Sequence, residues 1–312
     1  MQVAFVIPVF NERDTLRPLA EGICAHTPPP HEPWILFVDD GSTDGSTEVL
    51  DELAAECPEV NVLHLRGNFG KSAALAAGFA HVDAELVFTM DSDLQDDPKE
   101  IPRFIEKLNE GYDVVCGWKA QRHDPWHKTF PSRRYNAFVS WLFELPIHDV
   151  NCGFKLFRRD VVRHIQVYGE MHRLIPVLAH KLNYRVTEIP VEHHRRRYGV
   201  SKYGFERFFR GAADVLTMWF LTRYRHQPGH FFGKIGACQG LAGLLALVLA
   251  VAAASGSENT ALWGIAAIAG ALLLVSSGVA VCMGLLAEFM LHHFIRIDPA
   301  LYTAREDDDP AP

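Results

Sequence analysis

The stretch LVFTMDSDLQ, residues 86–95, joins a short apolar run to two carboxylates and an amide. The apolar part predicts a buried strand over Leu86–Met90, and Asp91, Asp93 and Gln95 follow at alternate positions. In an extended backbone, alternate side chains point to one side. Their oxygens are hard ligands that suit Mg²⁺ or Mn²⁺, and such an ion keeps positions open for phosphate oxygens. The pattern predicts a divalent metal site; the alternative is a polar loop in which Asp96-Asp97-Pro98 opens the next helix.

In the residues before this stretch, predicted strands alternate with predicted helices. Such alternation predicts βαβ units and an α/β domain with a mostly parallel sheet, whose ligands bind at the carboxyl ends of the strands. Polar clusters fall at three of these ends, at Asn11-Glu12, Asp39-Asp40 and Asp91-Ser92-Asp93. The predicted strands are Val3–Pro8, Trp34–Val38 and Val60–Leu65, and the predicted helices are Thr15–Ala25, a helix capped by Asp44 or Ser46 that runs through Ala55, and Lys71–His81.

The composition of the 312 residues narrows the class of protein. The formal net charge of −8 argues against a nucleic-acid binder, because phosphate-backbone binding needs a basic footprint. The six cysteines include no CxxC pair, which favours reduced thiols in a cytosolic compartment. The apolar segment Met1–Phe10 has no basic residue before it and is interrupted by Pro8, so it is interpreted as a strand and not a signal peptide.

Two uncharged segments, Ile235–Ala254 and Leu262–Ala287, are each long enough to span a bilayer. The alternative, two buried core helices, is disfavoured because core helices of this length usually carry a charged face. Lys and Arg residues flank the pair of segments, whereas the linking loop has none. Because basic residues favour the cytoplasmic side, the chain is predicted to lie in the inner membrane with its N-terminal domain and its C-terminus in the cytoplasm. The predicted parts are a catalytic domain (1–202), an amphipathic interfacial segment (203–230), two transmembrane helices (231–290) and a cytoplasmic tail (291–312).

Six motifs, in order, carry a family resemblance. They are IPVFNE (7–12), VDDGSTD (38–44), NFGK (68–71), MDSDLQ (90–95), NCGFKLF (151–157) and RYGVSKY (197–203). This series resembles the family 2 glycosyltransferases, and in particular the polyprenyl-phosphate branch that includes the dolichyl-phosphate mannose and glucose synthases. The resemblance implies a GT-A fold and inverting transfer. It implies that Pro8, Phe10, Asn11, Glu12 and Asp40 hold the nucleoside and that Asp91, Asp93 and Gln95 hold the metal and the diphosphate. Lys71 is expected to reach the diphosphate, with a surface lysine as the alternative.

The acceptor site is expected at the basic run Arg195–Arg197 and at Ser201-Lys202. Arg binds phosphate through a bidentate fork and Lys adds a point charge, so Arg197, Ser201 and Lys202 are the predicted acceptor-phosphate residues. There are two alternatives for this basic run: it could bind anionic lipid headgroups, or it could be a solvated surface without a ligand. A second basic group contains Arg133, for which the resemblance suggests a further phosphate contact.

A phosphate monoester acceptor is mostly dianionic at pH 7, since its second pKa is about 6. Such a nucleophile needs positioning more than a strong general base. Asp149, just before the NCGF motif, is the predicted orienting or weakly basic residue, with a loop or capping residue as the alternative. Some relatives carry Asp where this chain has Gly153, so the identity of a catalytic base stays open.

The function expected from these patterns is transfer of a hexose from a UDP-glucose or GDP-mannose type of donor to polyprenyl phosphate. One alternative is a family 2 enzyme with another lipid or glycan acceptor, although the chain has no QxxRW motif of processive synthases. Another is a non-catalytic membrane scaffold. The small residues Gly278 and Gly284 in the second span suggest packing against another helix, including that of a second copy.

Overall fold

The structure is a computed structural model that describes residues 1–120, 126–194, 206–224, 227–254 and 260–294. It contains two compact units, Met1–Leu216 and Thr217–Pro312. The predicted acceptor residues Arg197, Ser201 and Lys202 lie outside the described residues. The finer division at residues 202, 230 and 290 stays a prediction.

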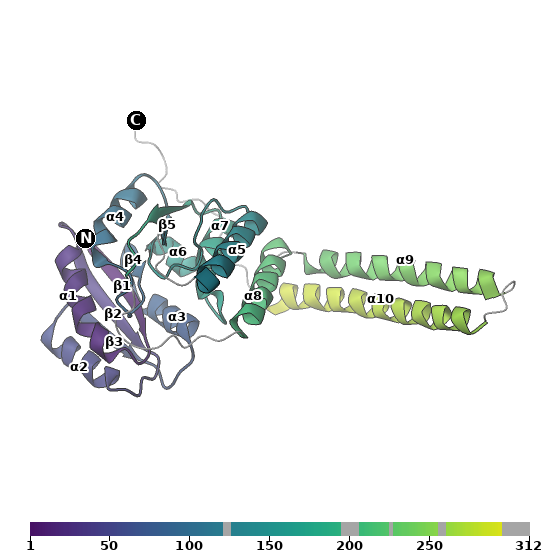
Figure 1. The fold of residues 1–312 in the computed structure, drawn as a ribbon, viewed down its shortest axis with the longest axis horizontal. Coiled ribbons are helices and arrows are strands. Elements are labelled where there is room, and N and C mark those ends of the chain that lie inside the picture. Colours follow the sequence, from purple (N-terminus) through teal and green to yellow (C-terminus); the bar gives the residue numbers. More distant parts are fainter. Residues whose placement is uncertain (121–125, 195–205, 225–226, 255–259, 295–312) are drawn as a thin grey trace. The chain divides into compact units, whose positions relative to one another are not determined.

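The first unit is built on one seven-stranded sheet with the strand order β3-β2-β1-β4-β6-β5-β7 (Figure 1). Only β6 runs antiparallel to its neighbours β4 and β5; the other pairings are parallel. The mostly parallel sheet expected from the sequence is therefore confirmed. The strands are β1 (Gln2–Val9), β2 (Glu32–Asp39), β3 (Val60–His64), β4 (Leu86–Thr89), β5 (Val114–Trp118), β6 (Lys155–Arg158) and β7 (Val186–Pro190).

The helices of the first unit follow the strands as expected, with one difference at a cap. The first residue before α2 is Gly45, in the left-handed region at φ 93°, and the predicted caps lie on either side of it. Asp44 accepts a bond from the Ser46 backbone N–H, so it stabilises the turn without being the cap. The helices are α1 (Leu16–His26), α2 (Ser46–Glu56), α3 (Lys71–His81), α4 (Ile101–Asn109), α5 (Trp126–Phe143), α6 (Arg159–His164) and α7 (Ile175–Lys181), with short 3-10 turns η1 (Arg13–Thr15), η2 (Pro98–Glu100) and η3 (Met171–Arg173).

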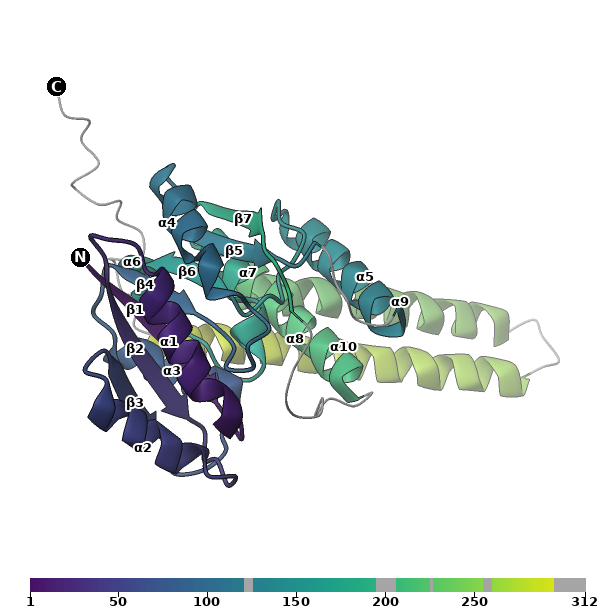
Figure 2. The same ribbon diagram turned by 60° about the vertical axis from the view of Figure 1, so that its left-hand side comes forward.

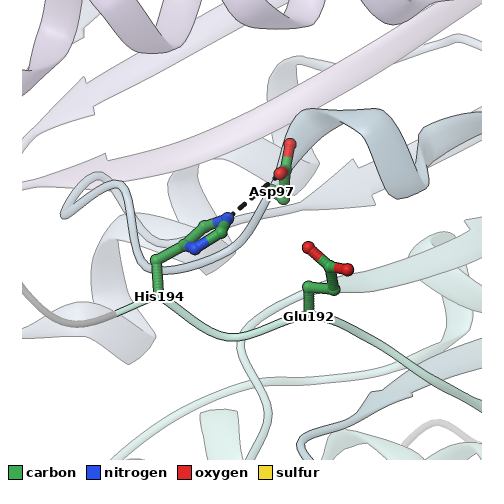
Figure 3. A group of neighbouring side chains, drawn as sticks. All are labelled: Asp97, Glu192 and His194. Carbon is green, nitrogen blue, oxygen red and sulfur yellow. Dashed lines mark hydrogen bonds and ion pairs between the residues drawn. The ribbon is translucent and has the colours of Figure 1, made fainter.

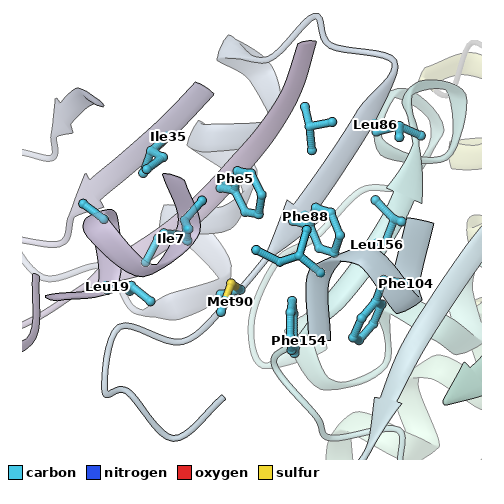
Figure 4. Close-up of a cluster of buried hydrophobic side chains, with 14 of the residues drawn as sticks. Phe5, Ile7, Leu19, Ile35, Leu86, Phe88, Met90, Phe104, Phe154 and Leu156 are labelled. Atoms are coloured by element: carbon cyan, nitrogen blue, oxygen red, sulfur yellow. The ribbon is translucent and has the colours of Figure 1, made fainter. Parts of the chain in front are cut away.

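One face of the sheet packs against α1, α2 and α4 and forms the main core. Aromatic rings dominate its centre, as Figure 4 shows. Phe5 and Phe88 stack with ring centroids 4.9 Å apart, and Phe104 meets Phe88 edge-on at 5.7 Å. Phe5 comes from β1 and Phe88 from β4, on the face that alternate strand residues share, and Phe104 comes from α4.

The other face packs against α3, α6 and α7. Close approach of α3 depends on Gly78, where an added Cβ would lie 2.3 Å from Val6 Cγ1. This approach places the first turn of α3 near the carboxyl ends of β1 and β4, where the predicted site residues lie.

The second unit is dominated by two long helices, α9 (Pro228–Ala254) and α10 (Thr260–Phe294), which run side by side in both views (Figures 1 and 2). Both are long and apolar enough to cross a membrane, and only 17% and 11% of their most apolar windows are buried. So little burial is unlike a core helix of a soluble domain. The preceding helix α8 (Glu206–Arg223) crosses the boundary between the units, and its predicted place along the membrane surface stays a prediction.

Small residues set the distance between α9 and α10. Ser277 Oγ donates to the Gly236 carbonyl at 2.7 Å, and a Cβ added to Gly243 would lie 2.8 Å from the Gly270 carbonyl oxygen. Gly284 also packs on α9, whereas a Cβ at Gly278 would meet nothing within 4 Å. Gly284 therefore stabilises the hairpin itself, and Gly278 faces open space.

Candidate active site

The loops after β1 and β2 are joined by hydrogen bonds at the carboxyl edge of the sheet. Asn11 Oδ1 accepts from the Thr43 backbone N–H at 2.7 Å, and the Asn11 N–H donates to Ser42 Oγ at 3.0 Å. The Glu12 N–H donates to Ser46 Oγ at 3.0 Å. The predicted nucleoside residues of the first loop thus have fixed backbone positions, and Pro8 and Phe10 are half-buried beside them.

Asp40 has a structural task that its motif did not reveal. It is 4% exposed, and its carboxylate accepts from the backbone N–H groups of Phe69 at 2.7 Å and Gly70 at 2.9 Å. These bonds fix the loop that leads into α3. A nucleoside contact by Asp40 stays a prediction.

Lys71 and Asp91 form an ion pair at the carboxyl end of β4. Lys71 opens α3, so the fixed loop before it aims its ammonium at the end of the neighbouring strand. Burial would raise the pKa of Asp91, but the charges of Lys71 and Lys119 outweigh burial and lower that pKa well below its usual range. Asp91 is therefore ionised at neutral pH.

The stretch after Asp91 is a turn, so the extended geometry expected from the sequence is wrong. Leu94 adopts a left-handed conformation at φ 57°, and the Gln95 backbone N–H donates to Asp93 Oδ1 at 3.2 Å. An Asp side chain that bonds two residues onward competes with extended backbone. Asp93 is 7% exposed, and Gln95 Nε2 donates to the His194 carbonyl at 3.2 Å.

Asp96 and Lys119 form a buried ion pair that sequence reasoning missed. Lys119 Nζ lies 2.9 Å from Asp96 Oδ1, with side chains 12% and 0% exposed. Burial alone would lower the pKa of Lys119, but the Asp96 charge raises that pKa above its usual value. Lys119 follows β5 directly, so the pair fixes the predicted metal loop to the end of that strand. An acidic residue after the DSDLQ motif was the only available signal.

A strand-like contact joins the same loop to the segment that follows β7. Asp96 and His193 form an isolated antiparallel bridge, and the His194 N–H donates to the Gln95 carbonyl at 2.9 Å. Figure 3 shows His194 turned toward Asp97, with Nε2 at 3.0 Å from Asp97 Oδ2, and the Glu192 carboxylate nearby. Ligand atoms of Asp97, Glu192 and His194 lie within 4.8 Å of one another. Asp97 already accepts from the Lys99 N–H and from this imidazole, so we assign the group a structural role.

Asp149 lies in a buried hydrogen-bond network. It is 1% exposed, and its Oδ1 accepts from Asn136 Nδ2 at 3.0 Å and from the Asn151 backbone N–H at 3.1 Å. Asn151 Nδ2 donates to Asn136 Oδ1 at 2.7 Å, which closes the network between α5 and the NCGF loop. Asp149 therefore positions Asn151. The predicted phosphate residue Arg133 is exposed on α5.

A pocket next to Asp91 contains two polar side chains that the sequence did not single out, Lys155 and His172. Lys155 is 2% exposed at the start of β6. His172 lies in η3, and burial together with the charge of Lys71 lowers its pKa to about 2, so the imidazole is neutral at neutral pH. Lys155 lies inside the NCGFKLF motif, which gave it no role of its own, and His172 lies in no motif; the fold brings both beside Asp91.

The donor set at the end of β4 fits a divalent metal. Asp91 is ionised, Asp93 is a buried carboxylate and Gln95 supplies an amide. Gly153 leaves room for the Asp91 carboxylate, since a Cβ built at Gly153 would lie 2.5 Å from Asp91 Oδ1. Two carboxylates with an amide oxygen match the hard ligands that Mg²⁺ and Mn²⁺ prefer.

Comparison with known proteins gives a consistent result. The family model described as "Glycosyl transferase family 2" matches residues 4–166. A dodecaprenyl-phosphate galacturonate synthase of Rhizobium johnstonii is 34% identical over 96% of this chain and 90% of its own length. An undecaprenyl-phosphate 4-deoxy-4-formamido-L-arabinose transferase of Klebsiella pneumoniae is also 34% identical, over 97% of this chain and 93% of its own.

Solved structures share the fold at low sequence identity. The glucosyl-3-phosphoglycerate synthase of Mycobacterium tuberculosis, solved with Mn²⁺ and UDP, has a TM-score of 0.54 at 15% identity and covers 71% of this chain and 79% of its own. A mannosyltransferase of Pyrobaculum calidifontis, solved with GDP-mannose and Mn²⁺, has a TM-score of 0.50 at 18% identity and covers 90% of this chain and 86% of its own. These likenesses support the expected GT-A fold.

Proposed function

Because this chain belongs to glycosyltransferase family 2, we propose that it transfers a sugar from a nucleotide-sugar to polyprenyl phosphate. The products are a polyprenyl-phosphate sugar and a nucleoside diphosphate. The names of the two bacterial relatives, similar over nearly the whole chain, support this acceptor class. The ionised Asp91 carboxylate, held by Lys71 at the end of β4, is the structural observation that carries the proposal.

Asp91, Asp93 and Gln95 are the residues proposed to hold Mg²⁺ or Mn²⁺. When bound, the ion neutralises the negative charge that develops on the leaving diphosphate. Lys71 forms an ion pair with Asp91 and is therefore placed to share in neutralising the charge on the diphosphate. The fixed loops at Asn11, Glu12 and Asp40 are the proposed nucleoside site.

The acceptor phosphate supplies the nucleophile. Its dianion attacks the anomeric carbon and the bond to the diphosphate breaks, which inverts the anomeric centre. Arg197, Ser201, Lys202 and Arg133 are the proposed phosphate-binding residues. Asp149 is hydrogen-bonded to Asn136 and Asn151, so we propose that it positions Asn151 and removes no proton.

The sugar is the finer part of the proposal. UDP-glucose and GDP-mannose types of donor follow from the family motifs. The relatives' names concern a galacturonate and a 4-deoxy-4-formamido-L-arabinose, which adds an acidic and an amide-bearing sugar to the donors worth testing.

The proposed location is the inner membrane. Helices α9 and α10 would form a transmembrane hairpin, with the first unit and the C-terminus on the cytoplasmic side. Lys234 before the first span and Arg296 after the second support this orientation, because basic residues favour the cytoplasmic side.

The test uses the full chain in detergent with a short polyprenyl phosphate, Mn²⁺ or Mg²⁺, and a panel of UDP- and GDP-sugars. We expect a lipid-linked sugar and a nucleoside diphosphate in equal amounts, both lost on chelation of the metal. Asp93→Asn should abolish transfer while the protein remains folded, whereas Lys107→Met, a surface substitution, should leave transfer unchanged. Diphosphate release without lipid product would indicate a different acceptor. No turnover with any donor would favour the scaffold alternative.

A further inference from the structure

A pocket lies between α3, β4, β6 and η3, next to the Asp91 carboxylate. Its enclosed part has room for about one water-sized group, and the rest opens to solvent. Gly153, which lies against Asp91, forms part of its wall. Its polar lining is formed by Lys71, Thr89, Asn151, Lys155 and His172. The pocket is therefore adjacent to the proposed diphosphate and metal site.

Lys155 is a buried amine whose described contacts include no carboxylate partner. Its Nζ donates to the Cys152 carbonyl, and the neighbouring Asp91 carboxylate is paired with Lys71. Burial lowers the pKa of Lys155 although the charge of Asp91 opposes this shift, and an anionic ligand beside Nζ would favour the charged form of the amine. The position of Lys155 is thus suited to an anion that arrives with a substrate.

The hydrogen bonds of Ser72 determine which nitrogen of His172 carries the proton. Ser72 Oγ accepts from the His172 backbone N–H at 3.2 Å and lies 2.9 Å from His172 Nδ1. Ser72 is 2% exposed, and Nδ1 is the acceptor within reach of its hydroxyl proton among the described contacts. We therefore assign Nδ1 as acceptor, which leaves the Nε2 N–H as a donor.

Asn151 adds one unsatisfied acceptor. Its Nδ2 donates to Asn136, but its buried Oδ1 has no hydrogen-bond partner within the described part of the chain. Buried polar atoms are nearly always paired, so an orphan in a pocket wall indicates a missing donor. A sugar hydroxyl has the required chemistry.

We infer that this pocket binds a substrate oxyanion through Lys155 and the Nε2 N–H of His172, with Lys155 as the residue that selects for it. The inference rests on the proposed function and names part of the substrate for that site. Two sources share this chemistry. One is a carboxylate on the transferred sugar, that is, a uronic acid donor, and the other is the phosphate of the lipid acceptor. Asn151 Oδ1 would accept from a neighbouring hydroxyl in the first case.

The experiment compares wild type, Lys155→Met and Lys155→Arg in the full chain. Binding of UDP-glucuronate and UDP-glucose (or GDP-mannuronate and GDP-mannose, if guanosine is the base) is measured by calorimetry with Mn²⁺. The KM for polyprenyl phosphate is measured by transfer. Lys107→Met is the matched control, because it removes a Lys from an exposed ion pair.

A sugar carboxylate predicts that Lys155→Met weakens binding of the uronate donor at least 10-fold and changes binding of the neutral donor less than 2-fold. An acceptor phosphate predicts unchanged donor binding and a KM for polyprenyl phosphate raised at least 10-fold. Lys155→Arg keeps the positive charge, so it should retain most of the wild-type affinity for either substrate. If Lys155→Met alters neither substrate, the inference is overturned.

A second variant covers the case in which Lys155→Met does not fold. His172→Asn keeps a polar atom at the Nδ1 position for Ser72 and removes the Nε2 donor. It should weaken the same substrate about 3- to 10-fold, and unchanged affinity for both substrates would count against the pocket. These results distinguish failure of this inference from failure of the proposed function. If uronate binding depends on Lys155 but no sugar reaches the lipid, the polyprenyl-phosphate acceptor is wrong and the anion pocket stands. If transfer to the lipid occurs and does not depend on Lys155, the proposed function stands and the anion pocket is wrong.

Discussion

The Asp91 carboxylate occupies the space beside Gly153 in which any other residue would carry its Cβ. A Cβ built at Gly153 lies 2.5 Å from Asp91 Oδ1, and Thr89 Oγ1 donates to the Gly153 carbonyl at 2.8 Å, which fixes the backbone there. Gly153 is therefore required by the carboxylate across from it.

Gly153→Ala should displace Asp91 and lower transfer about 100-fold, because misplacement by about 1 Å is enough for such a loss. The measurement is kcat with saturating metal and donor, with metal affinity as a second readout. Gly67→Ala is the control, since a Cβ at Gly67 meets nothing within 4 Å. Wild-type turnover in Gly153→Ala would show that the Asp91 position does not limit catalysis.

Lys119→Met should destabilise the protein by about 3–5 kcal/mol, because it leaves the buried Asp96 carboxylate without its partner. Denaturant unfolding of the full chain, followed by tryptophan fluorescence, measures the change. Lys107→Met, which removes an exposed pair with Glu110, should change stability little. Equal effects of the two substitutions would mean that the Asp96 pair contributes no more than a surface contact.

His172 should make stability depend on pH. Burial lowers its folded pKa to about 2, whereas the unfolded pKa is about 6.5. Between these values the unfolded chain binds a proton that the folded chain does not, so stability falls as pH falls below 6.5. The loss between pH 7 and 5.5 should be about 1.3 kcal/mol.

Comparison of wild type with His172→Asn isolates this contribution, because other groups titrate alike in both. The midpoint of urea unfolding at pH 7 and at pH 5.5 is the measurement. A pH response of the same size in His172→Asn would show that another group, such as His180, causes it.

Gly243→Ile should destabilise the α9–α10 hairpin by about 1–3 kcal/mol, because the added side chain meets the Gly270 carbonyl and Leu273. Gly278→Ile is the matched control, since a Cβ there has open space. Unfolding by SDS in mixed micelles compares the two. If Gly278→Ile changes only the oligomeric state, that face binds a second copy of the chain.

The early part of the fold was predictable because its signals are local. Apolar runs such as those in β1 and β4 end at polar clusters, and the alternation with helices determines a parallel sheet. The two apolar helices α9 and α10 were predictable for the same reason, although both are longer than expected, and their place in a membrane stays a prediction. The antiparallel strand β6, placed between β4 and β5, has no such signal, because its neighbours are far away in the sequence.

The site was predictable only where the family motifs pass through it. The motifs led to Asp91 and Asp93, but the left-handed turn at Leu94 depends on a side-chain bond that alternation cannot reveal. The partners Lys119, Lys155 and His172 come from separate elements and meet only in three dimensions. The place of Asp149 in the sequence predicts an orienting or weakly basic residue, and its buried hydrogen bonds favour the orienting role.

The bridge between Asp96 and His193 has a thermodynamic consequence. It joins the turn that would hold the metal to the segment that continues, in sequence, into Arg195–Arg197. If donor binding orders that turn, the bridge orders the segment up to His194 as well, and a lipid phosphate that contacts this segment then loses less conformational entropy on binding. Linkage requires the effect to be mutual, so the lipid should tighten the donor by the same factor as the donor tightens the lipid.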